Sequence, residues 1–262
     1  MSITALPPVR VEDLSLEYRI PRHSAGSLKE TMIRIARRGI AYDLLTAVND
    51  VTFDVRPGEV FGIIGPNGAG KSTLMKVIAR VLPPTNGRVR VRGRVSPMIE
   101  LGAGFNPEQT ARENVVLYGT LLGRDVRHMK ARCAAIADWA ELPDYLDVPI
   151  RAFSSGMLAR LAFAVAVDVK PDVLLVDEIL SVGDEAFQRK SSERMTELIE
   201  GGAAVILVTH NMQQVLDKAN RVLWLDHGRA VQIGDPAGTV SAYIKSTGGA
   251  VADASTSSAG NE

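Results

Sequence analysis

A glycine-rich segment of nine residues carries the clearest chemical signal in the sequence. Residues 65–73 read Gly-Pro-Asn-Gly-Ala-Gly-Lys-Ser-Thr and match the pattern G-x-x-x-x-G-K-[ST] in full. The glycines let the backbone curl so that its N–H groups point at phosphate oxygens, while Lys71 adds a positive charge and the Ser72 hydroxyl is a ligand type for Mg²⁺. The segment predicts a nucleoside triphosphate site that contains Gly65, Asn67, Gly68, Ala69, Gly70, Lys71, Ser72 and Thr73. A chance glycine loop is the alternative, and the apolar strand before it and the helical pattern after it disfavour that.

Two carboxylates follow an apolar strand about a hundred residues further along the chain. Val173–Val176 runs directly into Asp177 and Glu178. Two acidic residues at the end of a strand are also a common way to begin a loop. Taken alone, this pair is therefore as consistent with a structural role as with a functional one. Downstream of a phosphate loop, the pattern favours Asp177 in a magnesium shell and Glu178 beside the water that attacks the γ-phosphate in line. The sequence therefore predicts a protein that binds and hydrolyses a nucleoside triphosphate with magnesium.

A third segment places small polar residues at the start of a helix. Residues 153–157 read Phe-Ser-Ser-Gly-Met. The start of a helix attracts anions. A nucleotide bound in the phosphate loop of a chain leaves this second helix start of the same chain vacant. Ser155 and Gly156 could therefore contact the phosphate of a nucleotide that is bound by another copy of the chain. Taken alone, the segment favours an ordinary helix that is capped by Ser154 or Ser155.

Together these segments resemble the ABC-type ATPases, the nucleotide-binding subunits of ABC transporters, over about residues 10–240. Ser155-Gly-Met157 is similar to the signature turn of that family, with two departures from its usual L-S-G-G-Q. The resemblance implies that Asp177 is the magnesium aspartate and that Glu178 is the catalytic glutamate. It also implies that His210, which follows an apolar strand, is the switch histidine that senses the γ-phosphate.

Three further assignments rest on the same resemblance. Ser181–Asp184 resembles the loop that crosses the dimer interface. Glu100 stands near the place where the family carries a glutamine in the magnesium shell, and a glutamate there would add charge to the shell. Tyr18 stands in the place of the aromatic side chain that stacks on adenine. Tyr42, closer in sequence to the phosphate loop, is the alternative, and a tyrosine at a strand end can also simply pack.

Several segments resemble, more narrowly, the subgroup of ABC ATPases that exports polysaccharides. They are Glu100–Pro107, Arg112–Asn114, the Ser-Ser-Gly-Met turn and Ser181–Gln188. Members of that subgroup move lipid-linked O-antigen, teichoic acid or related cell-wall glycans. They also carry extra residues between the adenine-stacking aromatic and the phosphate loop, as this chain does at about residues 23–45.

The resemblance implies particular partners and a particular location. We expect a homodimer that closes over ATP, two copies of a separate transmembrane permease, a lipid-linked glycan as cargo and no nucleic acid partner. The subunit would be peripheral at the cytoplasmic face of the bacterial cell membrane. The alternatives are an ABC transporter for another substrate, a non-transport ABC ATPase of DNA repair or translation, and a phosphate-loop kinase. Repair types need long coiled coils or zinc cysteines, translation types carry two ATPase units, and a kinase would not need the signature turn or His210.

Composition sets the outer bounds of these interpretations. The 262 residues are 46% hydrophobic and 23% charged, which is ordinary for a globular protein. Thirty basic residues balance thirty acidic ones, so any anionic partner must be met by a local patch. Cys133 is the single cysteine, which excludes an internal disulfide. No apolar core follows a basic start, and apolar stretches such as Leu161–Val167 fall short of the ~20 residues that span a bilayer.

Alternating strands and helices must position the predicted site. Strands are expected at 48–55, 60–64, 173–176 and 204–208, after Asn86-Gly87, and in a hairpin around His227-Gly228. With the resemblance, this predicts an α/β fold of the P-loop NTPase (RecA-like) type: a mostly parallel sheet core, an antiparallel β subdomain and a helical insertion subdomain at about 108–167. We expect one nucleotide-binding domain over residues 1–245 and a disordered tail over 246–262.

The insertion at about residues 23–45 has the pattern of an amphipathic helix. One face is apolar, through Leu28, Met32 and Ile35, and another gathers Arg34, Arg37 and Arg38. Two interpretations are equally open. The segment is either a surface helix packed on its own domain, or an element at the cytosolic membrane surface near the entry of an anionic lipid-linked glycan.

Overall fold

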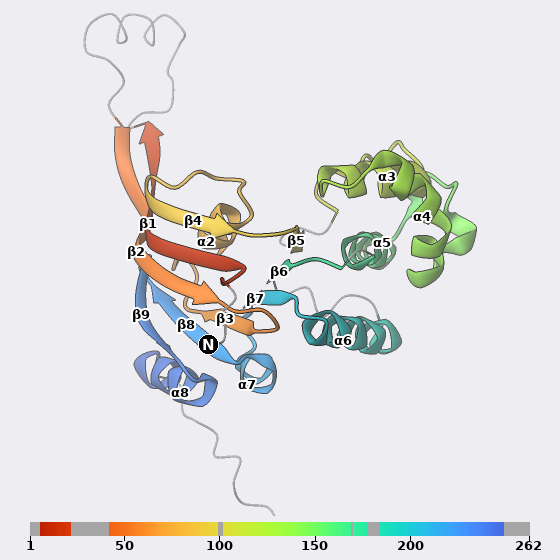
Figure 1. The fold of residues 1–262 in the computed structure, drawn as a ribbon. Helices are drawn as coiled ribbons and strands as arrows, with labels where there is room; N and C mark the ends of the chain where they lie inside the picture. Colours follow the sequence, from red (N-terminus) through yellow and green to blue (C-terminus); the bar gives the residue numbers. More distant parts are fainter. Residues whose placement is uncertain (1–5, 22–41, 99–101, 169, 178–183, 249–262) are drawn as a thin grey trace, which may run out of the picture.

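The computed structural model describes residues 6–21, 42–98, 102–168, 170–177 and 184–248. Two sheets and seven α-helices lie within these ranges (Figure 1). The strands are β1 (Val9–Pro21), β2 (Tyr42–Val55), β3 (Val60–Ile64), β4 (Asn86–Val91), β5 (Val95–Met98), β6 (Val173–Asp177), β7 (Ala204–Val208), β8 (Arg221–Asp226) and β9 (Arg229–Gly234). The helices are α2 (Lys71–Ile78), α3 (Ala111–Leu121), α4 (Val126–Trp139), α5 (Ser155–Val167), α6 (Glu185–Glu200), α7 (Met212–Lys218) and α8 (Pro236–Ser246).

The central sheet has six strands in the order β5-β6-β7-β3-β8-β9. Every neighbouring pair is parallel except β8 and β9, which form the hairpin expected around His227-Gly228. All residues of β3 and β7 are buried, because helices and a second sheet cover both faces of the central sheet. The predicted α/β class with a mostly parallel sheet is confirmed.

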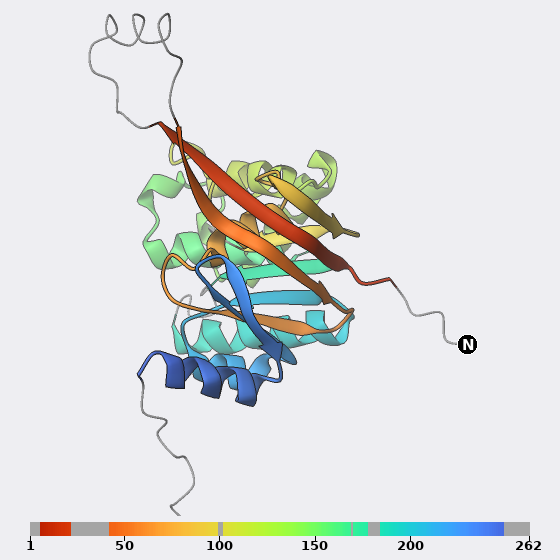
Figure 2. The same cartoon turned by 90° about the vertical axis from the view of Figure 1, so that its left-hand side faces the viewer.

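The second sheet is antiparallel, in the order β2-β1-β4, and β1 and β2 form its long strands (Figure 2). Pairing continues to the last residue of β1 and the first residue of β2, where Pro21 lies opposite Tyr42. This pairing places residues 42–45 in β2, although the sequence assigned them to the insertion. The remainder of the predicted insertion, 23–41, lies outside the described residues.

Hydrophobic cores cover both faces of the central sheet. Between the sheets, α2 buries Leu74, Met75 and Ile78, and the ring of Phe53 stacks on Phe61 with centroids 4.8 Å apart. On the opposite face, α5 and α6 pack against β6 and β7. The helix that begins at Lys71 ends at Ile78, and Arg80, two residues further along, adopts a left-handed φ of 62° that cannot continue it.

Helices α3, α4 and α5 form a separate group within the predicted 108–167 stretch. In Figure 1 this group lies on the far side of the molecule from the antiparallel sheet. It has its own core, and the second half of α5 joins it to the central sheet through Phe163 and Val167. Among the described residues, no helix combines the length and the apolar character needed to cross a membrane.

The entry to α3 depends on one fully buried polar side chain, Asn114. Its Nδ2 donates to the carbonyl oxygens of Asn106, Gln109 and Thr110 at 2.9–3.1 Å, and its Oδ1 accepts from Asn106 N at 2.7 Å. We expect Asn114→Ala to cost about 2 kcal/mol, because it leaves buried backbone groups without partners.

The measurement is urea unfolding of the purified chain, with Asn106→Ala as the matched control. The Asn106 side chain accepts one exposed hydrogen bond, from Glu108 N, so its loss should cost under about 1 kcal/mol. Equal destabilisation by the two changes would contradict the role of Asn114.

Candidate functional site

A cavity of about 310 Å³ opens where three neighbouring parallel strands end at the same edge of the central sheet. These strands are β6, β7 and β3. The cavity is lined by Tyr18, Leu45, Thr46, Ala47, Asn67, Gly68, Ala69, Gly70, Lys71, Ser72, Thr73, Asp177, Val208 and His210. The structure thus brings the glycine-rich loop together with an acid and a histidine that are distant in sequence.

The loop from Gly65 to Gly70 lies against two other backbone segments. A Cβ at Gly65 would lie 2.0 Å from the carbonyl oxygen of Leu225, and one at Gly70 would lie 2.2 Å from that of Ala47. Gly70 is also the N-cap of α2, with φ at 101° and no side-chain hydrogen bond at the cap. The N-cap residue itself thus offers no side-chain acceptor to the first N–H groups of α2, which suits an anion at this helix start.

Lys71 is buried within the loop that it follows. Its Nζ donates to the carbonyl oxygens of Gly65 at 2.7 Å and Pro66 at 2.9 Å. The side chain is 7% exposed and still lines the cavity. The ammonium charge is therefore held beside the loop amides, where a phosphate would lie, rather than in the hydrophobic core.

Ser72 and Asp177 both supply oxygen atoms to the lining of the cavity. Ser72 is exposed in the first turn of α2, and Asp177 lies at the end of β6, paired with Val208 of β7. A hydroxyl and one carboxylate, completed by phosphate oxygens and water, are a donor set that Mg²⁺ accepts. These residues fit the predicted magnesium ion. The predicted Glu100 and Glu178 lie outside the described residues.

His210 follows β7 and lines the cavity. The residues on both sides of it are fixed: Thr209 is 3% exposed and its Oγ1 accepts from Asn211 N at 3.1 Å. Asn211 in turn caps α7 by accepting from Gln213 N and Gln214 N. The exposed imidazole therefore projects from a well-anchored turn at the same sheet edge as Asp177.

The two tyrosines considered for adenine stacking have different surroundings. Tyr18 lines the cavity, and its hydroxyl lies 3.4 Å from Thr73 Oγ1. Tyr42 begins β2, is 47% exposed and is not part of the lining. The sequence missed Leu45, Thr46 and Ala47 as cavity residues. No local motif marks them, because the pairing of β2 with β1 alone sets their position.

The predicted signature turn does not reach this cavity within one chain. Ser154 caps α5 by accepting from Met157 N at 3.2 Å, which leaves the exposed Ser155 as the first helical residue. Neither Ser155 nor Gly156 lines the cavity.

Further along α5, an ion pair connects this helix to α6. Arg160 pairs with Asp184, the residue that caps α6. The hydrogen bond from Phe187 N, together with the Arg160 charge, holds the pKa of Asp184 below its ordinary value. Of the loop predicted to cross a dimer interface, Asp184 is described and residues 181–183 are not.

A phosphate-binding loop between a buried parallel strand and a helix, with an acid at the end of a neighbouring strand, defines a P-loop nucleotide-binding domain. A family model described as ABC transporter matches residues 48–181. The chain is 39% identical to the O-antigen export system ATP-binding protein RfbB of Klebsiella pneumoniae, over 90% of this chain and 97% of that protein. The chain therefore belongs to the ABC transporter family, which implies ATP binding and hydrolysis.

Two further comparisons agree with this membership. The teichoic acids export ATP-binding protein TagH of Lactiplantibacillus plantarum is 38% identical, over 90% of this chain and 64% of that protein. A solved structure, described as a dimeric post-hydrolysis state of the ATP-binding cassette MJ0796 bound to ADP and Pi, has a TM-score of 0.67. It is 21% identical and covers 87% of this chain and 98% of that one, so it supports the fold.

The backbone contacts of the loop generate a prediction. Gly70→Ala should lower the Tm markedly, because the new Cβ must displace the carbonyl of Ala47 and the loop with it. Gly68→Ala is the matched control. Its φ of 80° is also positive, but no atom lies within 4 Å of the added Cβ, so only backbone strain of about 1–2 kcal/mol is expected. Thermal unfolding without nucleotide measures both, and equal shifts in Tm would contradict the close contact.

Proposed function

We propose that this protein is the ATP-hydrolysing subunit that energises an exporter of lipid-linked polysaccharide. The observation that carries this is the single cavity that joins the glycine-rich loop, Asp177 and His210. The choice of cargo is supported by relatives that are named for the export of O-antigen and of teichoic acids.

The residues predicted for the site have distinct proposed roles. The loop amides and Lys71 hold the β- and γ-phosphates, and Tyr18 stacks on the base. Ser72 and Asp177 hold Mg²⁺, with Glu100 as a further ligand, and the ion when bound offsets charge on the phosphate oxygens. Glu178 orients and activates the attacking water, and His210 contacts the γ-phosphate. Catalysis then depends mainly on positioning and on electrostatic stabilisation of the transferring phosphoryl group.

We propose further that two copies close head to tail over two ATP molecules. The support is the separation, within one chain, between the cavity and the turn formed by the exposed Ser155 and the partly exposed Gly156. In the dimer, the turn of one copy would meet the γ-phosphate held by the other, at the positive end of α5. Two copies of a separate transmembrane permease would bind this dimer at the cytoplasmic face of the cell membrane.

The first test of the site is Lys71→Ala. Removing the ammonium takes away charge stabilisation of the phosphates. The chain should stay folded by circular dichroism while ATP turnover falls by at least about a hundredfold. Lys245→Ala, at an exposed position near the end of α8, is the control and should keep normal turnover. Normal turnover in folded Lys71→Ala protein would refute the assignment of the site.

The second test concerns the dimer. Glu178→Gln keeps the reach of the side chain but removes the carboxylate that activates water and a negative charge beside the triphosphate. We expect this variant to run as a dimer with ATP and magnesium on size exclusion, and as a monomer with ADP.

Adding Ser155→Arg should abolish that dimer, because the larger side chain fills the space that the partner's phosphate must enter. Glu178→Gln protein that stays monomeric at saturating ATP, or a dimer that is unaffected by Ser155→Arg, would count against this arrangement.

A further inference from the structure

The C-terminal end of α5 is held by several side chains from other elements. The last carbonyls of a helix have no partner within the helix. Here Arg124 donates through Nη1 to the carbonyl oxygen of Val165 and through Nη2 to that of Ala166, at 3.0 Å for the latter. Ser96 Oγ also donates to the Ala166 carbonyl at 3.0 Å.

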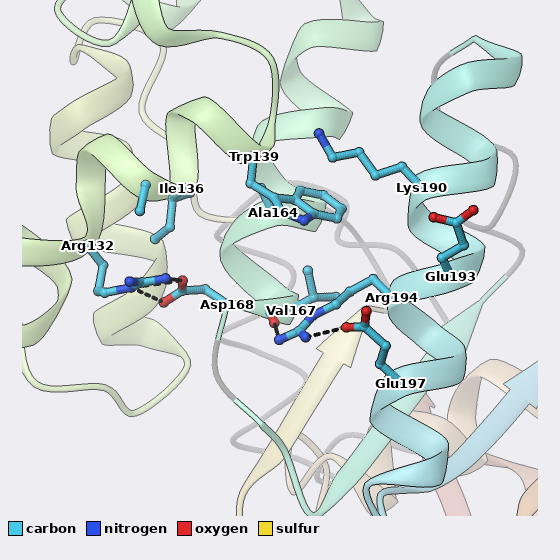
Figure 3. A pocket seen from close by; sticks show the side chains of 11 residues that line it. Arg132, Ile136, Trp139, Ala164, Val167, Asp168, Lys190, Glu193, Arg194 and Glu197 are labelled. Carbon is cyan, nitrogen blue, oxygen red and sulfur yellow. Dashed lines mark hydrogen bonds and ion pairs between the residues drawn. The ribbon is translucent and has the colours of Figure 1, made fainter.

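A second arginine and an ion pair complete this attachment. Arg194 Nη2 donates to the carbonyl oxygen of Val167 at 3.0 Å. Arg132 pairs with Asp168, the C-cap of α5, whose side chain is only 4% exposed. Figure 3 shows Arg132 directed at Asp168, and Arg194 lying between the end of α5 and Glu197. The positive charges also suit the negative end of the helix dipole.

These side chains come from four different parts of the fold. Ser96 belongs to β5 in the central sheet and Arg194 to α6 on its face, whereas Arg132 belongs to α4 and Arg124 to the connection between α3 and α4. At the end of α5, side chains from the helical group and from the sheet core therefore bind neighbouring backbone carbonyls, and the carbonyl of Ala166 is bound from both sides.

The opposite end of the same helix is the Ser155–Gly156 turn. Thirteen residues make α5 about 20 Å long. A tilt of about 5° at the fastened end would move the turn by nearly 2 Å over this length. A misplacement of about 1 Å in a catalytic group can cost up to about a hundredfold in rate.

We propose that Arg194, with Ser96, is a positioning residue for ATP hydrolysis. It fixes the direction of α5 and so the place at which the Ser155–Gly156 turn meets the phosphate of the other copy. The inference rests on the proposed function, because the turn matters only if it completes a partner's site.

Arg194 is a suitable residue for testing the proposal, because its side chain does not pack in the hydrophobic core. It is 30% exposed and borders an open cavity of about 330 Å³ between α4, α5 and α6. Replacing it with Met keeps an apolar stem of similar length and removes the donors. The protein should therefore fold, and the first helical turn of α5 should become less well fixed.

The experiment compares Arg194→Met with the wild type in ATP turnover and in amide hydrogen exchange. We expect kcat to fall about fivefold to tenfold, with the ATP concentration at half-saturation changed less than about twofold, since the phosphate loop is untouched. Exchange should quicken in the segment 153–160. Arg194→Lys keeps one donor and should restore most of kcat, and Ser96→Ala should lower kcat about twofold to threefold by loosening the same end.

Glu197→Gln is the matched control, because it removes the negative charge of the other partner of Arg194 and leaves the bond to Val167. It should keep normal turnover and exchange. Wild-type kcat and unchanged exchange in folded Arg194→Met protein would overturn the proposal, and so would an equal loss in Arg194→Lys. If amide exchange is faster in Arg194→Met but the wild-type protein itself shows no ATP turnover, the result would instead contradict the proposed function.

Discussion

The nucleotide cavity depends on how closely the glycine-rich loop can approach neighbouring backbone. The carbonyl of Ala69 accepts a hydrogen bond from Gly228 N at 3.0 Å, and the carbonyl of Gly228 accepts one from Asn49 N at 2.8 Å. These two bonds join the loop to the β8–β9 turn and to β2. They form only because the glycines have no Cβ to hold the chains apart. With the loop fixed in this way, Lys71 and the first N–H groups of α2 have a defined direction.

Local motifs and buried apolar runs made much of this protein predictable. The strands β3, β6 and β7 were predicted because burial on both faces demands continuous apolar sequence. The residues from Gly65 to Thr73 and Asp177 were singled out by motifs next to such strands, and His210 through the family resemblance. Their meeting in one cavity then follows from the parallel order of the sheet, which brings the carboxyl ends of neighbouring strands to one edge.

The remaining features of the fold and the site could not be predicted from the sequence, because strand pairing and side-chain packing determine them. Residues 42–45 look like part of an insertion until β1 is placed beside them, and Leu45 to Ala47 become cavity wall only through that register. Helix α8 was missed although Asp235 and Pro236 form a recognisable start, because its partly apolar face is short and gains its partners from β8 and α7. The hydrogen bonds that hold the end of α5 join residues that are distant in sequence, and no sequence pattern predicts them.

The long pairing of β1 with β2 has a mechanical consequence. Tyr18 and Leu45 face each other across these strands within a few residues of the point where the ribbon leads into residues 22–41. The wall of the cavity and the end of the ribbon at Pro21 and Tyr42 therefore share one ladder of paired residues, so a change in the register of this pairing moves both together. A binding event at the wall and one at the end of the ribbon would be coupled only if both altered this pairing, and each would then change the affinity for the other by the same factor.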